Sequence, residues 1–178
     1  MAEVEVWKGR DFKTTHERKA LESIIHAFNT SKSIYSEKVF MLSNFILGDR
    51  EIDLTIIKSN SIAVVELKKC GESFTATENL NWVTSDGYVI GSKNKNPYQQ
   101  LREYRFKWID FIQKHKKDFF PNGINQTAIY QIFGLVVIDP SLRTDIRNKI
   151  PKETTWFQLI GLDKICLLYT SPSPRDRG

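Results

Sequence analysis

The sequence predicts an α/β fold in which a mixed central sheet is flanked by helices. Helical periodicity marks two amphipathic segments, at 15–29 and from 97 to about 116. Short runs rich in β-branched and aromatic residues have the character of strands, at 34–42, 45–47, 51–57, 62–68 and 130–138. The resulting order is α-β-β-β-α-β, which is typical of a sheet covered by helices.

Both helices are predicted from a start signal and an apolar stripe. Thr14 and Glu17 fit a capping box, in which a hydroxyl and a carboxylate satisfy early backbone N–H groups. Asn96 is a good N-cap, Pro97 a good first residue, and Gln99 is placed to close a second capping box. The expected buried stripes are Ala20, Leu21, Ile24, Ile25 and Phe28, and Leu101, Tyr104, Trp108, Phe111 and Ile112.

The segments 51–57 and 62–68 are predicted to form a hairpin. The polar turn between them contains Asn60, a residue type that tolerates positive φ. Centring the turn on Ser59 and Asn60 pairs Ile57 with Ile62, Thr55 with Val64, Asp53 with Glu66, and Glu51 with Lys68. Directly opposed residues have Cβ atoms roughly 4.5–5.5 Å apart, so the two acids would repel each other.

This predicted acidic pair indicates a metal site. Mg²⁺ takes hard oxygen ligands, so a cation between Asp53 and Glu66 would convert repulsion into binding. Lys68 shares their face, because strand side chains alternate. The opposite face is apolar and expected to be buried: Ile52, Leu54, Ile56, Ala63, Val65 and Leu67. Two acids and a lysine at a sheet edge suit phosphodiester hydrolysis; the alternative is a set of solvated charges.

Composition limits the classes of function. The chain has 178 residues, of which 40% are hydrophobic and 26% charged, as expected for one soluble globular domain. No apolar run approaches a membrane span and no signal peptide begins the chain, so we expect a cytoplasmic protein. Cys70 and Cys166 indicate no disulfide framework, and His16, His26 and His115 lack zinc spacing. The net charge of +5 permits a nucleic-acid partner.

Residues 69–95 are expected to form a short β excursion, 143–150 a short helix, and 156–160 a last strand. Residues 166–178 resemble one reading frame of a transposase adapter used for sequencing libraries. We therefore expect one domain over 1–165, followed by a non-native tail in place of a further, fused C-terminal domain. The alternative for 166–178 is a Ser/Pro-rich linker.

Taken in order, these elements and their motifs resemble the PD-(D/E)xK nuclease superfamily and, within it, the nuclease-related domain family, NERD. The motifs are GDREID at 48–53, Val65-Glu66-Leu67-Lys68, and Asn96-Pro97-Tyr98-Gln99-Gln100. The resemblance covers most of residues 14–138 and implies a restriction-endonuclease-like αβββαβ core. Ile52 stands where the superfamily has a proline, which NERD members commonly lack too.

The resemblance also implies a role for each matching residue. Asp53 and Glu66 would hold Mg²⁺ or Mn²⁺ with the backbone carbonyl of Leu67. Lys68 would orient the attacking water or stabilise the transition state, and Gln100 would hold water or phosphate.

Glu17 matches the acidic residue of the family's first helix and would orient the metal shell. Its alternative role is that of a helix cap alone, and Gln100 has the alternative of bridging core and surface.

The implied activity is hydrolysis of DNA by a metal-dependent nuclease-like domain, with RNA as the other candidate substrate, within a longer bacterial DNA-processing protein. The alternatives are a non-catalytic nucleic-acid-binding module and a regulatory module of the same fold. Basic residues in and before the second helix are candidates for phosphate contacts: Lys93, Lys95, Arg102, Arg105, Lys107, Lys114, Lys116 and Lys117. The simpler interpretation of this region, which we favour for 114–117, is a solvated helix face. Trp82 and Tyr88 are candidates for base stacking, although core packing is the simpler interpretation.

Overall fold

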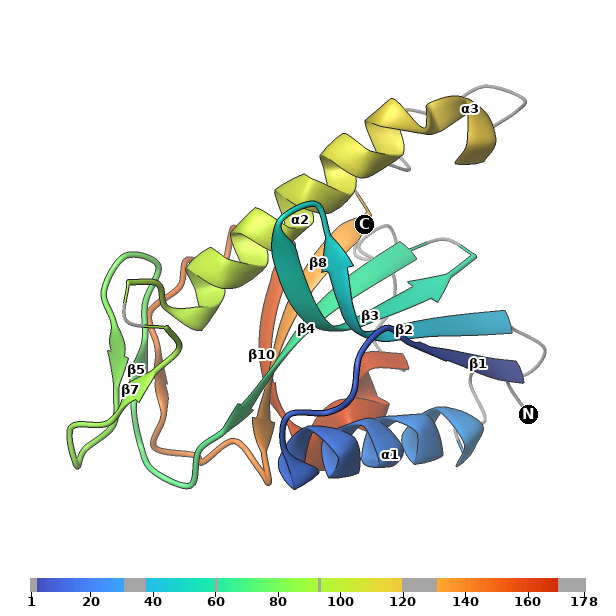
Figure 1. Cartoon of the computed structure of the whole chain (residues 1–178). Coiled ribbons are helices and arrows are strands. Elements are labelled where there is room, and N and C mark those ends of the chain that lie inside the picture. The colour runs from blue at the N-terminus through green and yellow to red at the C-terminus, as the bar shows by residue number, and fades with distance from the viewer. Residues whose placement is uncertain (1–2, 31–37, 60, 93, 120–130, 170–178) are drawn as a thin grey trace, which may run out of the picture.

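A six-stranded mixed sheet forms the centre of the computed structural model, which describes residues 3–30, 38–59, 61–92, 94–119 and 131–169 (Figure 1). In spatial order its strands are β1 (Glu3–Lys8), β2 (Lys38–Leu47), β3 (Arg50–Lys58), β4 (Ser61–Lys69), β8 (Ile132–Asp139) and β10 (Phe157–Gly161). The β2–β3–β4 run is antiparallel, whereas β1–β2, β4–β8 and β8–β10 pair in parallel. The predicted αβββαβ order is confirmed.

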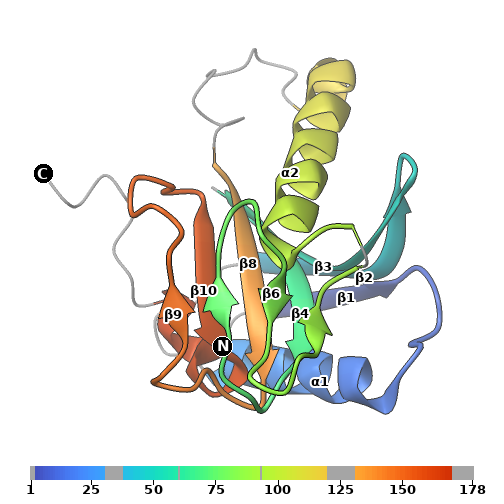
Figure 2. The ribbon, with the colours of Figure 1, turned by 90° about the vertical axis from the view of Figure 1, so that its left-hand side faces the viewer.

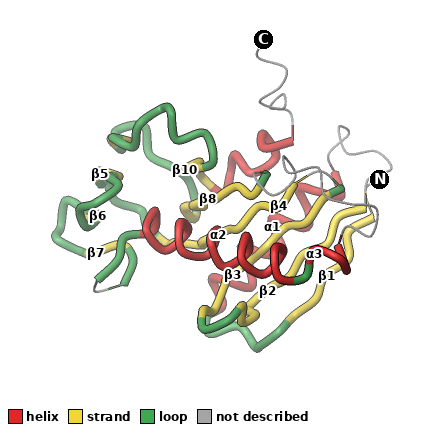
Figure 3. The backbone as a smooth tube through the Cα atoms, turned by 90° about the horizontal axis from the view of Figure 1, so that it is seen from above, coloured by secondary structure: helices red, strands yellow, loops and turns green. Residues whose placement is uncertain are grey.

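Helices cover both faces of this sheet (Figures 1 and 3). On one face, α1 (Thr15–Thr30) buries Ala20, Leu21, Ile24 and Phe28, as predicted, while Ile25 is partly buried. These side chains pack on Leu54, Val65, Leu135 and other strand residues, and the 3₁₀ helix η3 (Leu162–Tyr169) completes that layer through Ile165.

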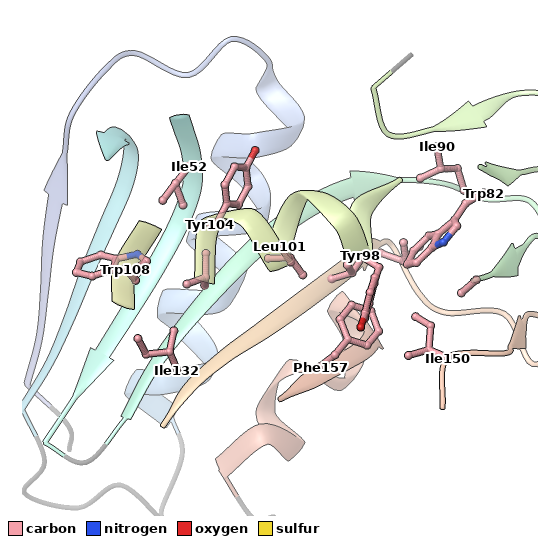
Figure 4. Packing of buried hydrophobic residues seen from close by; sticks show 14 of the residues in the cluster. Ile52, Trp82, Ile90, Tyr98, Leu101, Tyr104, Trp108, Ile132, Ile150 and Phe157 are labelled. Atoms are coloured by element: carbon pink, nitrogen blue, oxygen red, sulfur yellow. The ribbon is translucent and has the colours of Figure 1, made fainter. Parts of the chain in front are cut away.

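The other face is covered by α2 (Pro97–Lys114), which is followed by the short α3 (Lys116–Phe119). The predicted capping box is confirmed, because the Gln99 N–H donates to Asn96 Oδ1 at 2.9 Å and the Asn96 N–H donates to Gln99 Oε1 at 3.3 Å. The stripe of α2 packs on the sheet as predicted, with Phe111 only partly buried (Figure 4). Its buried members are Leu101, Tyr104, Trp108 and Ile112.

The predicted β excursion between β4 and α2 consists of β5 (Thr75–Ala76), β6 (Trp82–Val83) and β7 (Val89–Ile90) and faces the viewer in Figure 2. Trp82 is fully buried and stacks on Phe74 with ring centroids 5.5 Å apart. The Asn96 side chain joins the excursion to the start of α2, because its Nδ2 donates to the carbonyls of Thr77, Glu78 and Leu80.

The predicted short helix at 143–150 is wrong. This segment makes a turn and the strand β9 (Arg147–Asn148), which runs parallel to β5. The Arg147 N–H donates to the Phe74 carbonyl at 3.2 Å and the Lys149 N–H donates to the Ala76 carbonyl at 2.9 Å. Backbone groups that a helix would have used are therefore paired with a distant part of the chain.

Several other expectations need adjustment. Strand β1 was not predicted, although the alternation in Glu3-Val4-Glu5-Val6 is typical of a strand. The predicted strands 34–42 and 45–47 are one strand, β2, from Lys38 onward. Residues 34–37, Asn60, Lys93 and 170–178, the end of the expected tail, lie outside the described residues. In the described part of the chain, no helix has the length and apolar character that a membrane crossing requires.

Candidate active site

The candidate site lies where the β3–β4 hairpin stops pairing. Thr55 pairs with Val64 and Ile57 with Ile62, as predicted, but the regular ladder ends at Leu54 and Val65. The predicted backbone pairing of Asp53 with Glu66 is therefore wrong. Instead, the side chain of Asp53 reaches across to β4, where its Oδ2 accepts the Leu67 N–H at 2.9 Å.

The same correction applies to Glu51, which was expected opposite Lys68. Glu51 Oε2 lies 2.5 Å from Lys13 Nζ, beside the start of α1. Lys68 forms an ion pair with Glu66 on its own strand. The charged residues therefore form two separate ion pairs, Glu51 with Lys13 and Glu66 with Lys68.

A backbone irregularity explains why the ladder breaks at Asp53. On β2, Ser43 pairs with Leu54 and Phe45 with Ile52, and Asn44 between them has a φ of 46°. Side-chain alternation changes here: Leu54 packs on the α1 side, whereas Ile52 and Phe45 pack on the α2 side. The prediction that Ile52 shares a face with Leu54 is wrong, because a left-handed residue on the neighbouring strand reorients the pleat.

Glu66 is the most deeply buried charged residue of the site, with an exposed fraction of 3%. Its Oε1 lies 2.5 Å from Lys68 Nζ, while its Oε2 is buried with no hydrogen-bond partner among the described residues. Burial alone would lower the pKa of Lys68, but the charges of Glu66 and Asp53 outweigh burial and raise it. Lys68 is therefore held as an ammonium beside a carboxylate that has one oxygen to spare.

The same surroundings favour the charged form of Lys68 but disfavour the charged form of Asp53. Burial, and then the charge of Glu66, raise the pKa of Asp53 to about 7, although the Leu67 N–H and Lys68 oppose the shift. A like charge nearby disfavours ionisation of a carboxyl group, and Glu66 has this effect on Asp53. A bound cation would relieve this repulsion.

Gln100 and Glu17, the other predicted site residues, lie on the two helices. Gln100 is in the first turn of α2, and its Oε1 is buried with no partner among the described residues. Glu17 takes part in the cap of α1: its N–H donates to Thr14 Oγ1 at 3.2 Å, and its Oε2 accepts the Lys13 N–H at 3.0 Å. Glu17 is still close enough to contribute to the raised pKa of Asp53.

Tyr104 is a neighbour of the site that the sequence interpretation treated only as core. Burial, followed by the charges of Glu66 and Asp53, raises the pKa of its phenol, so Tyr104 lies within electrostatic reach of the two carboxylates. Figure 4 shows its side chain projecting from α2 near Ile52. The signal was available in the sequence, because Tyr104 lies four residues after Gln100 and so on the same helical face.

The donor set fits a hard cation such as Mg²⁺ or Mn²⁺. Among the predicted site residues, Glu66 Oε2 and Gln100 Oε1 are buried without a partner in the described part of the chain, and the charge of Glu66 acts on the Asp53 carboxylate. Over the residues that the structure describes, no three His, Cys, Asp or Glu side chains gather into a metal cluster. A cation here would depend on two carboxylates plus neutral oxygens, which agrees with the preference of Mg²⁺ for keeping several waters.

The basic residues near α2 serve different purposes. Arg105 is structural, because its Nε donates to the Ile132 carbonyl at 2.8 Å and its guanidinium lies 5.5 Å from the ring of Trp156. Lys107 pairs with Asp49 at 2.9 Å, and Lys95 pairs with Glu103. The exposed members are Arg102, Lys114, Lys116 and Lys117.

Comparison with known proteins identifies the family. The model of the nuclease-related domain, NERD, matches residues 4–138. Neither the curated proteins nor the solved structures contain a significant match to the chain. The matched span contains every residue of the candidate site, from Glu17 on α1 to Gln100 on α2. The chain therefore belongs to the nuclease-related domain family, and its core has the restriction-endonuclease-like fold.

Proposed function

We propose that this nuclease-related domain hydrolyses phosphodiester bonds in DNA with the help of Mg²⁺ or Mn²⁺. The observation that carries the proposal is the buried Glu66: its Oε1 pairs with Lys68, its Oε2 has no hydrogen-bond partner among the described residues, and its charge acts on Asp53. Burying such a pair lowers stability unless a ligand repays it. A bound cation would offset the negative charges of Asp53 and Glu66, and a phosphate would offset the positive charge of Lys68.

Asp53 and Glu66 would hold the cation, together with the backbone carbonyl of Leu67. When bound, the cation lowers the pKa of a water ligand and offsets charge on the phosphate. The hydrogen bond from the Leu67 N–H fixes the Asp53 carboxylate at the end of the ladder. This bond keeps the Asp53 side chain turned towards β4 and Glu66.

Lys68 and Gln100 would act on the substrate. The raised pKa of Lys68 keeps its ammonium charged at neutral pH, so it is suited to stabilise negative charge on a phosphate oxygen as the bond breaks. The free Oε1 of Gln100 can accept a hydrogen from the attacking water and so orient it. Glu17 would position Lys13 and the start of α1 at the edge of the site.

The charge distribution favours a nucleic-acid substrate, and DNA is the one proposed here. The chain carries a net charge of +5, and Arg102 and Lys114 are exposed on α2. Such charges bind a phosphate backbone without reading its sequence, and the binding weakens steeply with salt.

A cleavage assay with matched variants tests the proposal. Purified protein would be incubated with supercoiled plasmid, single-stranded DNA and RNA, each with Mg²⁺, Mn²⁺ or a chelator. Glu66→Ala should abolish metal-dependent cleavage, whereas Glu22→Ala, which removes an exposed acid from the outer face of α1, should retain it. Equal cleavage by wild type and Glu66→Ala would reveal a contaminant and contradict the assignment. DNA binding without cleavage under all these conditions would indicate the non-catalytic binding module instead.

A further inference from the structure

Tyr88 occupies an unusual position at the tip of the excursion. It follows the β6–β7 turn and its side chain is 63% exposed, so the expectation that it packs in the core is wrong. Trp82 and Ile90, on the same hairpin, are buried at 0% and 1% (Figure 4). The hairpin thus exposes the aromatic side chain of Tyr88 while the side chains of Trp82 and Ile90 are buried.

The backbone that carries Tyr88 is tightly held. Its N–H donates to Thr84 Oγ1 at 2.8 Å, and its carbonyl accepts the Thr84 N–H at 2.9 Å. The carboxylate of Asp86 is turned inward onto the Thr84 hydroxyl. Below the turn, Trp82 Nε1 donates to the Thr77 carbonyl at 2.8 Å, and Asn96 ties the same loop to α2. The backbone that carries the exposed ring is therefore fixed by hydrogen bonds to the rest of the excursion and to α2.

Backbone contacts connect Tyr88 to the segment that follows the candidate catalytic residues. Tyr88 is held opposite Thr84, and Thr84 forms an isolated bridge with Phe74, which comes shortly after the end of β4. Lys68 is near the end of β4, and the excursion begins immediately after that strand. Figure 1 shows the excursion standing beyond the end of β4 and alongside the start of α2. A nucleotide bound at Lys68 would thus have an exposed aromatic ring beside it.

We propose that Tyr88 stacks on an unpaired base next to the scissile phosphate and thereby makes the domain selective for single-stranded DNA. This inference rests on the proposed function, since Lys68 marks the position of the phosphate. Every base has a π face, so such stacking tolerates any sequence. In a duplex, both faces of each base are already stacked on neighbouring bases, and an aromatic side chain gains contact only where the strand is open.

The outer surface of the hairpin supports this occupant. Val83 and Val89 form a backbone pair beside Tyr88 and are 44% and 37% exposed. They add exposed apolar surface to the hairpin that carries the ring. Apolar contact with a base face and attraction of a phosphate to Lys68 are the two contributions that single-strand binding sites combine.

A binding assay in the presence of a chelator tests the inference without depending on catalysis. The probe is a fluorescein-labelled thymidine oligonucleotide, alone or annealed to its complement, and Kd is measured by anisotropy. Tyr88→Ala should weaken single-strand binding about tenfold, the size of one base–aromatic stack. Tyr88→Phe should bind like the wild type, because the ring is kept. Phe106→Ala, which removes another exposed aromatic from α2, is the matched control and should have no effect.

Several results would overturn the inference: no single-strand binding by the wild type, no change in Tyr88→Ala, equal weakening on the duplex, or an equal effect of Phe106→Ala. Its failure is separable from that of the proposed function. Glu66-dependent cleavage combined with normal binding by Tyr88→Ala would reject stacking and retain the nuclease. Single-strand binding that depends on Tyr88, without cleavage in any metal, would retain stacking and reject hydrolysis.

Discussion

Replacing Asp53 with asparagine should stabilise the domain at alkaline pH when divalent cations are removed. The pKa of Asp53 is raised from 3.8 to about 7 by burial and by Glu66. The unfolded chain therefore loses this proton near 3.8, while the folded chain keeps it until about 7. The folded state binds more protons between these values, so the free energy of unfolding falls as the pH rises through them. Asparagine carries no charge and still offers a carbonyl oxygen to the Leu67 N–H.

The size of the effect follows from the two pKa values. At about 1.4 kcal/mol per pH unit, the difference between 3.8 and about 7 sets a ceiling of about 4 kcal/mol. Asp53 is partly accessible to water, which screens its charge, so we expect roughly half of that ceiling, about 2 kcal/mol. For a chain of this size, each kcal/mol changes Tm by about 2–4 °C, which gives an increase of about 4–8 °C.

Thermal unfolding followed by circular dichroism in a chelator would measure this. Asp53→Asn should exceed the wild type in Tm at about pH 8, and the difference should vanish near pH 4, where folded wild type has a protonated Asp53. Asp110→Asn, an exposed site on α2, is the control. Millimolar Mg²⁺ should raise the Tm of the wild type more than that of Asp53→Asn, because the ligand binds the folded state through this carboxylate. A variant that is no more stable than wild type at about pH 8 would refute the reasoning.

Three further substitutions probe the site and the core, each measured by chemical denaturation. Lys68→Met should lower the free energy of unfolding by about 3 kcal/mol in a chelator, because it leaves the buried carboxylate of Glu66 without its cation, and Mg²⁺ should restore part of the loss. Gly134→Ala should cost about 1–3 kcal/mol, because its new Cβ would lie 2.7 Å from Trp156 Cζ3. Ile24→Ala should cost about 2–5 kcal/mol, because Ile24 is fully buried between α1 and the sheet.

Local chemistry explains the parts of the fold that the sequence predicted well. The start of α2 depends on Asn96, Pro97 and Gln99, three neighbouring residues whose preferences all agree, and the capping box forms as expected. The inner half of the β3–β4 hairpin is similar, because a short turn sets the register of Ile57 with Ile62. In both cases, the information lies within a few residues along the chain.

The errors have longer-range causes. The pairing of residues 143–150 was missed because their partners lie on β5, which is distant in the sequence and shows no signal of its own that matches β9. Ile52 packs on the α2 side of the sheet instead of the α1 side because of the backbone conformation of Asn44, which lies on another strand. The exposure of Tyr88 depends on Trp82 and Ile90 filling the interior, which periodicity over such short strands does not specify.

The candidate site lies where the sheet departs from regular structure in two ways: the β3–β4 ladder is interrupted, and a charged residue is buried. A continuous ladder would have paired Asp53 through its backbone, whereas the break lets its side chain reach the Leu67 N–H. An apolar residue at position 66 would pack with less cost than a carboxylate that is 3% exposed. Each departure lowers the stability of the unliganded fold, and each leaves an oxygen or a charge directed at the same small region. The two departures share a single physical explanation if a cation and a phosphate complete the site. The stability of Asp53→Asn and wild type with and without Mg²⁺ therefore tests, independently of cleavage, whether the site holds a cation.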